Sequence, residues 1–115
     1  MSEIQLLRYR LKDGQRDRLY EWMDTVTSRR DEALATLQDE TVYSEAAFLE
    51  SRPDGEYVSF YMEAEALEAA AAAFEASTHD IDHQFKQLLS EVVAEEQPDE
   101  DIEPLYHLAN PDRPS

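Results

Sequence analysis

Two of the chain's three histidines, His79 and His83, lie four residues apart, with Asp80 and Asp82 between them. Imidazoles at positions i and i+4 of one helix can hold Zn²⁺ or a similar ion when a third ligand is near. The same residues also fit a plain helix start, in which Thr78 or Asp80 caps the first turn and both histidines face solvent. His79 and His83 are therefore candidate metal ligands by their spacing alone, because the chain contains no HExxH motif.

A second candidate site combines His107 with Tyr61 and Glu63. His107 lies in a segment of strand-like composition, and Tyr61 and Glu63 project from the same face of another predicted strand. An imidazole beside them could act as a general base toward an acidic phenol or enol, the proton transfer that oxidation without a cofactor requires. The alternative is a histidine whose ring hydrogen-bonds a backbone carbonyl or a carboxylate. We take His107, Tyr61 and Glu63 as candidate catalytic residues.

Several kinds of site are excluded by what the sequence lacks. Gly14 and Gly55 are its only glycines, so it has no glycine-rich phosphate loop, and it contains no GxSxG motif. It has no cysteine, which rules out disulfides and thiolate metal sites. Its Lys and Arg residues form no basic stripe that would neutralise phosphates, so we expect no nucleic-acid partner. We likewise expect no cofactor.

Acidic residues dominate the composition: 27 Asp and Glu stand against 10 Lys and Arg, for a net charge of −17. The acids are spread along the whole chain, a pattern typical of proteins from a salt-saturated cytoplasm, where counterions screen self-repulsion. An acidic surface for a basic partner is the alternative interpretation. There is no run of ~18 apolar residues for a membrane span and no secretory pattern at the start. We therefore expect a halophilic, cytoplasmic protein without membrane contact.

The residues from Val42 to Glu63 predict a β-hairpin around which the other elements are arranged. Pro53, Asp54 and Gly55 suit a type I turn that closes the hairpin with a bulge. Both flanks are rich in aromatic and β-branched residues, and apolar side chains occur on both faces of each strand. Since a sheet with one face in water alternates more strictly, we expect both faces to be covered.

Periodicity predicts the remaining elements. Apolar residues recur with helical spacing over 15–38, along an alanine-rich run over 65–77, and from Ile81 to Val93. Strands are predicted at 3–11 and at 102–108, and the second must lie at a sheet edge because Pro104 cannot donate a ladder hydrogen bond.

This order of elements is the β-α-β-β-α-β pattern of ferredoxin-like α+β domains. We expect one domain over 1–109, with an antiparallel sheet centred on its first and third strands and helices on one face, and a flexible tail over 110–115. The apolar side chains on the helix-free face predict a homodimer in which two copies pack sheet against sheet. A second copy and a small-molecule ligand are the only partners we expect.

The element order resembles that of the dimeric α/β-barrel superfamily, which includes cofactor-free monooxygenases of antibiotic biosynthesis and stress-responsive barrels. Several segments are also similar to a family of short haloarchaeal proteins of unknown function. These segments are Leu11 to Gly14, Arg18 to Met23, Arg29 to Leu34, Phe74 to Asp82 and Leu105 to Pro111. The resemblance implies the barrel fold and agrees with the halophilic interpretation, but it maps no catalytic residue onto this chain.

Three functions remain open at this stage. The first is a dimeric-barrel protein that binds or transforms a small, partly aromatic molecule in a monooxygenase-like way, in a cavity walled by at least one of Tyr61, Glu63 and His107. The second is a non-catalytic homodimeric binding or regulatory module, which predicts a filled core. The third is a divalent-metal site at His79 and His83.

Overall fold

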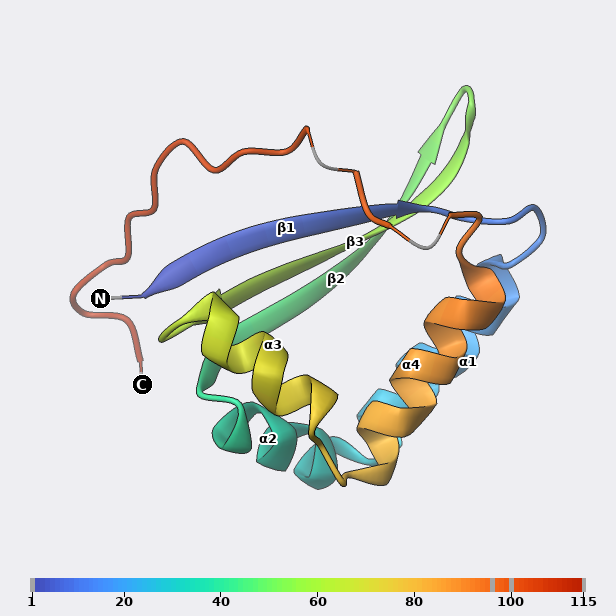
Figure 1. Cartoon of the computed structure of the whole chain (residues 1–115). Coiled ribbons are helices and arrows are strands. Elements are labelled where there is room, and N and C mark those ends of the chain that lie inside the picture. The colour runs from blue at the N-terminus through green and yellow to red at the C-terminus, as the bar shows by residue number, and fades with distance from the viewer. Residues whose placement is uncertain (1, 96, 100, 115) are drawn as a thin grey trace.

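The computed structural model describes residues 2–95, 97–99 and 101–114. Within them a three-stranded antiparallel sheet carries four helices on one face (Figure 1). The elements are β1 (Glu3–Arg10), α1 (Arg16–Ser28), α2 (Arg30–Asp39), β2 (Val42–Arg52), β3 (Gly55–Ala64), α3 (Leu67–Glu75) and α4 (Asp80–Val92). The α+β class, the antiparallel sheet and the placing of helices on one face are thus confirmed.

Strand β3 forms the centre of the sheet, because it pairs with β2 on one side and with β1 on the other, so the expected central place of the first strand is not found. Arg52 pairs with Gly55, which leaves Pro53 and Asp54 as a two-residue loop. Gly55 has a φ of 143°, a backbone angle that only glycine adopts without strain. The register shift lies between Val42 and Ser44, at the far end of the hairpin from the bulge that the turn sequence predicts.

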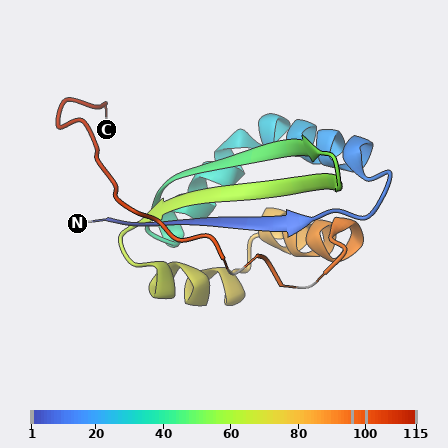
Figure 2. The same ribbon diagram turned by 90° about the horizontal axis from the view of Figure 1, so that it is seen from above.

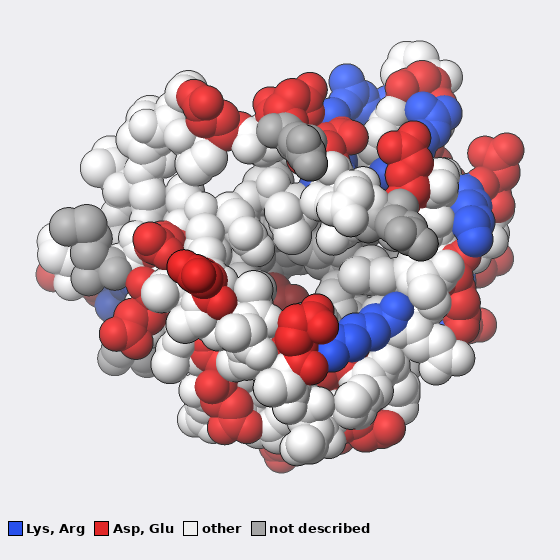
Figure 3. Space-filling view, viewed as in Figure 1, with Lys and Arg blue, Asp and Glu red and all other residues white. Residues whose placement is uncertain are grey.

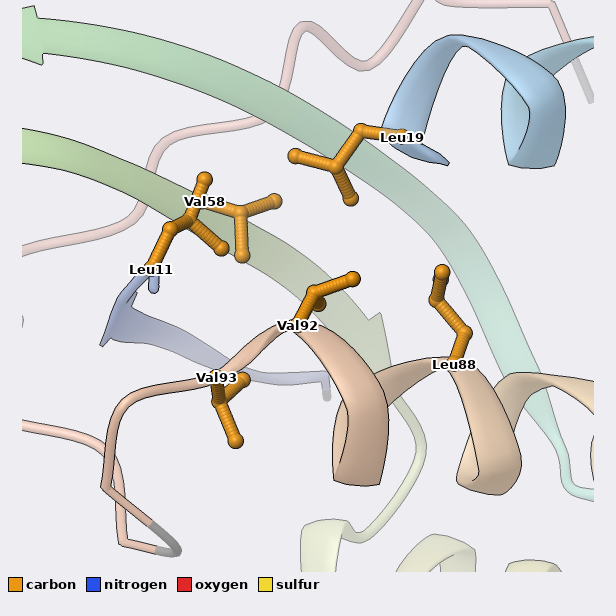
Figure 4. Packing of buried hydrophobic residues seen from close by; sticks show 6 residues of the cluster. All are labelled: Leu11, Leu19, Val58, Leu88, Val92 and Val93. Carbon is orange, nitrogen blue, oxygen red and sulfur yellow. The ribbon is translucent and has the colours of Figure 1, made fainter. Parts of the chain in front are cut away.

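The core lies where α4 and α1 pack beneath one end of the sheet. Leu88 and Val92 are fully buried and meet Val58 of β3, while Leu19 approaches from α1 (Figure 4). This is the apolar stripe that helical spacing predicts for α4. A second, smaller cluster joins Val42, Ala64 and Ala70, where the alanine-rich α3 comes close to the sheet.

The predicted helix over 15–38 is wrong in one respect, since two helices occupy this segment. The chain leaves helical geometry at Arg29, with φ −113° and ψ 38°. Just before the break, the hydroxyls of Thr25, Thr27 and Ser28 donate to main-chain carbonyls of α1. Such bonds compete with the helical ladder and favour an end here. The break directs α2 toward the far end of the sheet, where Glu40 follows it.

The predicted strand over 102–108 is not formed. Instead, the residues after α4 run along the outer edge of β1: Leu11 bridges Val93, and the amides of Ala94 and Asp99 donate to Arg10 and Arg8, each at 2.8 Å. These bonds use the free edge of β1 at Arg8 and Arg10, so the later segment does not pair with the strand there. It leaves the sheet and passes over the helix-free face near the N-terminus (Figure 2).

Candidate functional site

A cavity of about 490 Å³ separates the sheet from the helices. Figure 3 shows the molecule hollowed between these two layers. The volume falls in the range of roughly 300–1,000 Å³ that is usual for small-molecule sites. Its walls are mostly apolar, with inward-facing residues of the three strands on one side and residues of all four helices on the other.

An aromatic cluster forms one wall of the cavity, with Phe85 of α4 at its centre. The Phe85 ring lies 5.5 Å from Trp22, 5.2 Å from Phe60 and 6.0 Å from Phe74, measured between ring centroids. Tyr9 continues the cluster at 6.1 Å from Phe60. Rings at these distances in tilted and edge-to-face arrangements attract one another, so the wall is a preformed surface for a flat or branched apolar ligand.

Three carboxyl groups from three elements line the same cavity. Glu40 is the residue that ends α2, Glu45 lies on β2, and Asp82 lies in the first turn of α4. Glu40 and Asp82 are only 6 % and 8 % exposed. Glu45 keeps accessible surface and yet has its pKa raised by burial, which is the expected behaviour of a side chain that faces an internal hollow.

The charges of these acids are poorly compensated. Burial, together with the charge of the neighbouring Asp82 carboxylate, the hydrogen bond shared with it and the charge of Glu45, raises the pKa of Glu40 to about 8. The ring of His79 acts in the opposite direction, and it is held 2.6 Å from Asp39. Oδ2 of Asp82 is buried and makes no hydrogen bond to any of the described residues. A buried acceptor in this state is costly unless a donor arrives from elsewhere.

The backbone that carries Glu40 is strained. Thr41, the next residue, has a φ of 53°, a left-handed conformation that is rare for a β-branched side chain. Its hydroxyl donates to the Glu40 carbonyl at 2.6 Å, and its own carbonyl accepts the amide of Glu65 at 3.0 Å. These bonds hold the turn between α2 and β2 in place, and with it the position of Glu40 at the cavity wall.

The predicted catalytic residues Tyr61, Glu63 and His107 come together, but at a different place. Glu63 lies on the helix-free face, where its carboxylate is 3.7 Å from the ring of His107 and is bound in bidentate fashion by Arg113 at 2.9 and 3.1 Å. Tyr61 is among the cavity-lining residues, but the alternation of β3 directs its side chain to the face of Glu63. It is close enough to Arg113 to raise the pKa of that guanidinium.

Glu63 is 1 % exposed and has an environment opposite to that of the cavity acids. Hydrogen bonds from Arg113 and from the hydroxyl of Ser2 lower its pKa to about 2. Neither Glu63 nor His107 lines the cavity. Arg113, within the segment predicted to be a flexible tail, was not anticipated as a partner.

The candidate metal ligands His79 and His83 lie at the start of α4. His79 precedes the first helical residue, and the Asp39 carboxylate raises the pKa of its ring. His83 is exposed on the first turn. Within the described residues no group of three or more His, Asp or Glu side chains is arranged to hold a metal ion.

The sequence analysis did not identify the cavity acids, although two of them occupy positions where the periodicity of their element places an apolar residue. Asp82 precedes Phe85 and Leu89 by three and seven positions, so it shares the inward stripe of α4. Glu45 alternates with Ala47 and Leu49 on the inward face of β2. An acid at an apolar-face position was the signal that could have identified this site.

One family model matches residues 2–113, almost the whole chain, and its description is a family of unknown function (DUF6176). No curated protein and no solved structure matches the chain significantly. No helix among the described residues is long and apolar enough to cross a membrane.

Proposed function

The chain belongs to this family of unknown function (DUF6176), and we propose from its geometry that it binds a small, largely apolar and partly aromatic molecule between its sheet and its helices. The observation that carries the proposal is the cavity of about 490 Å³ with its aromatic wall. A purely structural module predicts a filled core, because an apolar void of this size forfeits the packing that stabilises the surrounding side chains.

The test is a thermal-shift screen in molar KCl against phenols, quinones, haem and divalent metals. A ligand of the proposed kind raises the unfolding midpoint of the wild type. Ala71→Phe fills the cavity from α3 and should abolish this shift, while Ala72→Phe, at the adjacent exposed position outside the lining, should preserve it. If no small molecule stabilises the chain, the alternative of a non-catalytic homodimeric module is favoured.

Chemical transformation of the ligand, in the way of a cofactor-free monooxygenase, stays a prediction. The contact of His107 with Glu63 supports a bound imidazole rather than a free base aimed at the cavity. If His107→Ala leaves every ligand response unchanged, His107 is removed from the site. Stabilisation of the wild type by Zn²⁺, lost in His83→Ala, would instead support the metal site at His79 and His83.

We further propose that a second copy covers the helix-free face of the sheet, as the dimeric barrel requires. Leu6 and Phe48 lie on this face and are 36 % and 57 % exposed. An edge-strand phenylalanine open to water on a sheet face is unfavourable, and burial against an identical face would cover both copies at once.

The charges on this face support a self-contact despite the net charge of −17. Three guanidiniums, those of Arg8, Arg10 and Arg52, lie over the ring of Tyr57 at 5.2 to 5.8 Å. Their carboxylate partners are Asp99, Asp54 and Glu50. Acid and base are therefore balanced here, so two copies can meet without the repulsion expected of the remaining surface.

Sedimentation of Phe48→Glu in molar KCl tests the dimer. The wild type should sediment as a dimer and the variant as a monomer, because the substitution buries a charge in the contact. Met23→Glu, at a similarly exposed position of α1 on the helix side, should remain dimeric. A monomeric wild type at every concentration would contradict the proposal.

We also propose that the protein works in strong salt. Acidic side chains are spread over the face shown in Figure 3, and they outnumber the basic ones. Added KCl should raise the unfolding midpoint, because screening relieves repulsion among surface carboxylates. A midpoint that does not respond to KCl would contradict this assignment.

A further inference from the structure

The three cavity acids point to the chemistry of the ligand. They approach the cavity from separate parts of the chain: Glu40 from the end of α2, Glu45 from β2 and Asp82 from α4. Because they are brought together only by the fold, their grouping is a property of the tertiary structure.

Asp82 is the residue that indicates a missing partner. It is 92 % buried, since its exposed fraction is 8 %, and its Oδ2 has no hydrogen-bond partner among the described residues. A proton shared with Glu40 accounts for one carboxyl of the group. Oδ2 of Asp82 is then a buried acceptor that still needs a donor, and Glu45, an exposed residue of β2, adds negative charge at the wall of the same cavity.

Two nearby cations are engaged by acids outside the cavity. The ring of His79 is engaged by Asp39, and Arg29 is bound by Glu32 and Asp80. Arg30 also lines the cavity, but it is an exposed residue. Glu63 differs from these acids, because its buried carboxylate accepts hydrogen bonds from a guanidinium and from a hydroxyl.

An ammonium group fits this environment better than a metal ion. Within the described residues the acids are not arranged as three ligands of one metal ion. An ammonium group carries up to three N–H donors, each of which needs one acceptor. The aromatic wall of Trp22, Phe60 and Phe85 would pack against the apolar part of the ligand, and ring faces also attract an adjacent cation.

We propose that the cavity binds an organic amine, in which an ammonium group lies among Asp82, Glu40 and Glu45 and an aryl or alkyl body lies against the Phe85 cluster. This inference rests on the proposed function and specifies the class of ligand. The ammonium donates to the carboxyl group of Asp82, whose Oδ2 has no hydrogen-bond partner among the described residues.

Three probes with the same carbon skeleton test the charge requirement: 2-phenylethylamine, 2-phenylethanol and phenylacetate. Affinities are measured by calorimetric titration of the full chain near neutral pH, at one fixed KCl concentration. The amine should bind at least about tenfold more tightly than the alcohol, the gain expected of one charge-assisted hydrogen bond in a buried site. Phenylacetate should not bind measurably, because its carboxylate would meet the three acids.

Substitutions then locate the effect. Asp82→Asn should reduce the affinity for the amine by about tenfold while the affinity for the alcohol stays unchanged. Glu45→Gln, on an edge strand where folding is not at risk, should reduce the preference for the amine in the same direction. Asp24→Asn changes the net charge equally on the outer face of α1 and should have no effect.

The outcomes separate this inference from the proposed function. Equal binding of amine and alcohol, blocked by Ala71→Phe, would overturn the amine proposal and leave the cavity as an apolar binding site. A preference for the amine that persists in both Asp82→Asn and Glu45→Gln would also overturn it. If none of the probes binds, the amine proposal is overturned, and the general ligand screen decides separately whether the cavity binds any small molecule.

Discussion

Glu63 and Glu40 are both nearly inaccessible, at 1 % and 6 % exposed, but their pKa values are displaced in opposite directions. The pKa of Glu63 is lowered to about 2, and that of Glu40 is raised to about 8. Burial raises the pKa of both carboxyls, so burial cannot explain the difference. Arg113 and Ser2 donate to Glu63, whereas Glu40 has two further acids for neighbours. The charge of Glu63 is therefore compensated within the chain, whereas in the proposed site around Glu40 the compensating cation comes from the ligand.

The largest effect on stability is expected from removing Arg113, the cation that binds Glu63. In Arg113→Ala the Glu63 carboxylate stays buried without its partner, and we expect the unfolding midpoint near neutral pH to fall by roughly 10 °C. Arg18→Ala, which removes a cation from the exposed pair with Glu91, should have little effect. A similarly small change of the midpoint in both variants would show that Arg113 is not needed to stabilise the buried Glu63 carboxylate.

The pH dependence gives this prediction its sign. Glu63 is ionised more readily in the folded chain than at its ordinary pKa of 4.5, so its stabilising contribution is complete above that value. It is lost as the pH falls through about 2. The difference between the midpoints of the wild type and Arg113→Ala should accordingly shrink over this interval in thermal scans.

A smaller effect of opposite sign is expected at Glu40. The folded chain holds the Glu40 proton up to a pH of about 8, whereas the unfolded chain releases it near 4.5. The contribution of Glu40 to stability therefore decreases as the pH rises through this interval. Glu40→Gln removes the ionisation, and we expect its midpoint to exceed that of the wild type by roughly 5 °C in alkaline solution, with little difference in mild acid.

The matched control for this prediction is Glu68→Gln, at an exposed position of α3, which should show the wild-type pH profile. The midpoints are compared between variants at each pH, because the whole acidic surface also titrates. If the Glu40→Gln and wild-type profiles run parallel, the cavity acids are neutralised by a group within the chain.

The smallest effect concerns salt. Because the Glu63 carboxylate is buried and counterions screen buried charges less than exposed ones, the midpoint difference between Arg113→Ala and the wild type should vary less with KCl than the difference for Arg18→Ala. The small difference for Arg18→Ala should vanish as KCl is added. A strong salt dependence of the Arg113 contact would show that it is open to solvent and would weaken the contrast with Glu40.

Local pattern was sufficient for most of the fold. The hairpin followed from its turn residues and aromatic flanks, and α4 followed from an apolar stripe that the structure buries at Leu88 and Val92. The single predicted helix over 15–38 was wrong because side-chain hydroxyls near Ser28 end α1, a competition that periodicity does not register. The strand predicted at 102–108 was wrong, and it is Ala94 and Asp99 that bond the outer edge of β1, at Arg10 and Arg8.

The candidate site shows the limit of the same approach. The histidines and tyrosines were candidates because their side chains are chemically versatile. Glu63 and His107 do lie close together, and Tyr61 lies near the Arg113 that binds Glu63. The acids at the cavity were overlooked because the chain has 27 acidic residues, and residue type alone does not distinguish these three from the others. Only their positions on inward faces distinguish Asp82 and Glu45 from the surface acids.

The sequence by itself determined the antiparallel hairpin, the strand β1, the apolar stripe of α4 and the acidic composition, because these depend on residue types at short spacing. Tertiary structure alone decided which acids are neutralised, since Arg113 reaches Glu63 across 50 positions of the chain, while Glu40, Glu45 and Asp82 come to one cavity from separate elements. Electrostatic energy depends on distance in space and on exclusion of water, and neither quantity is contained in the order of the residues.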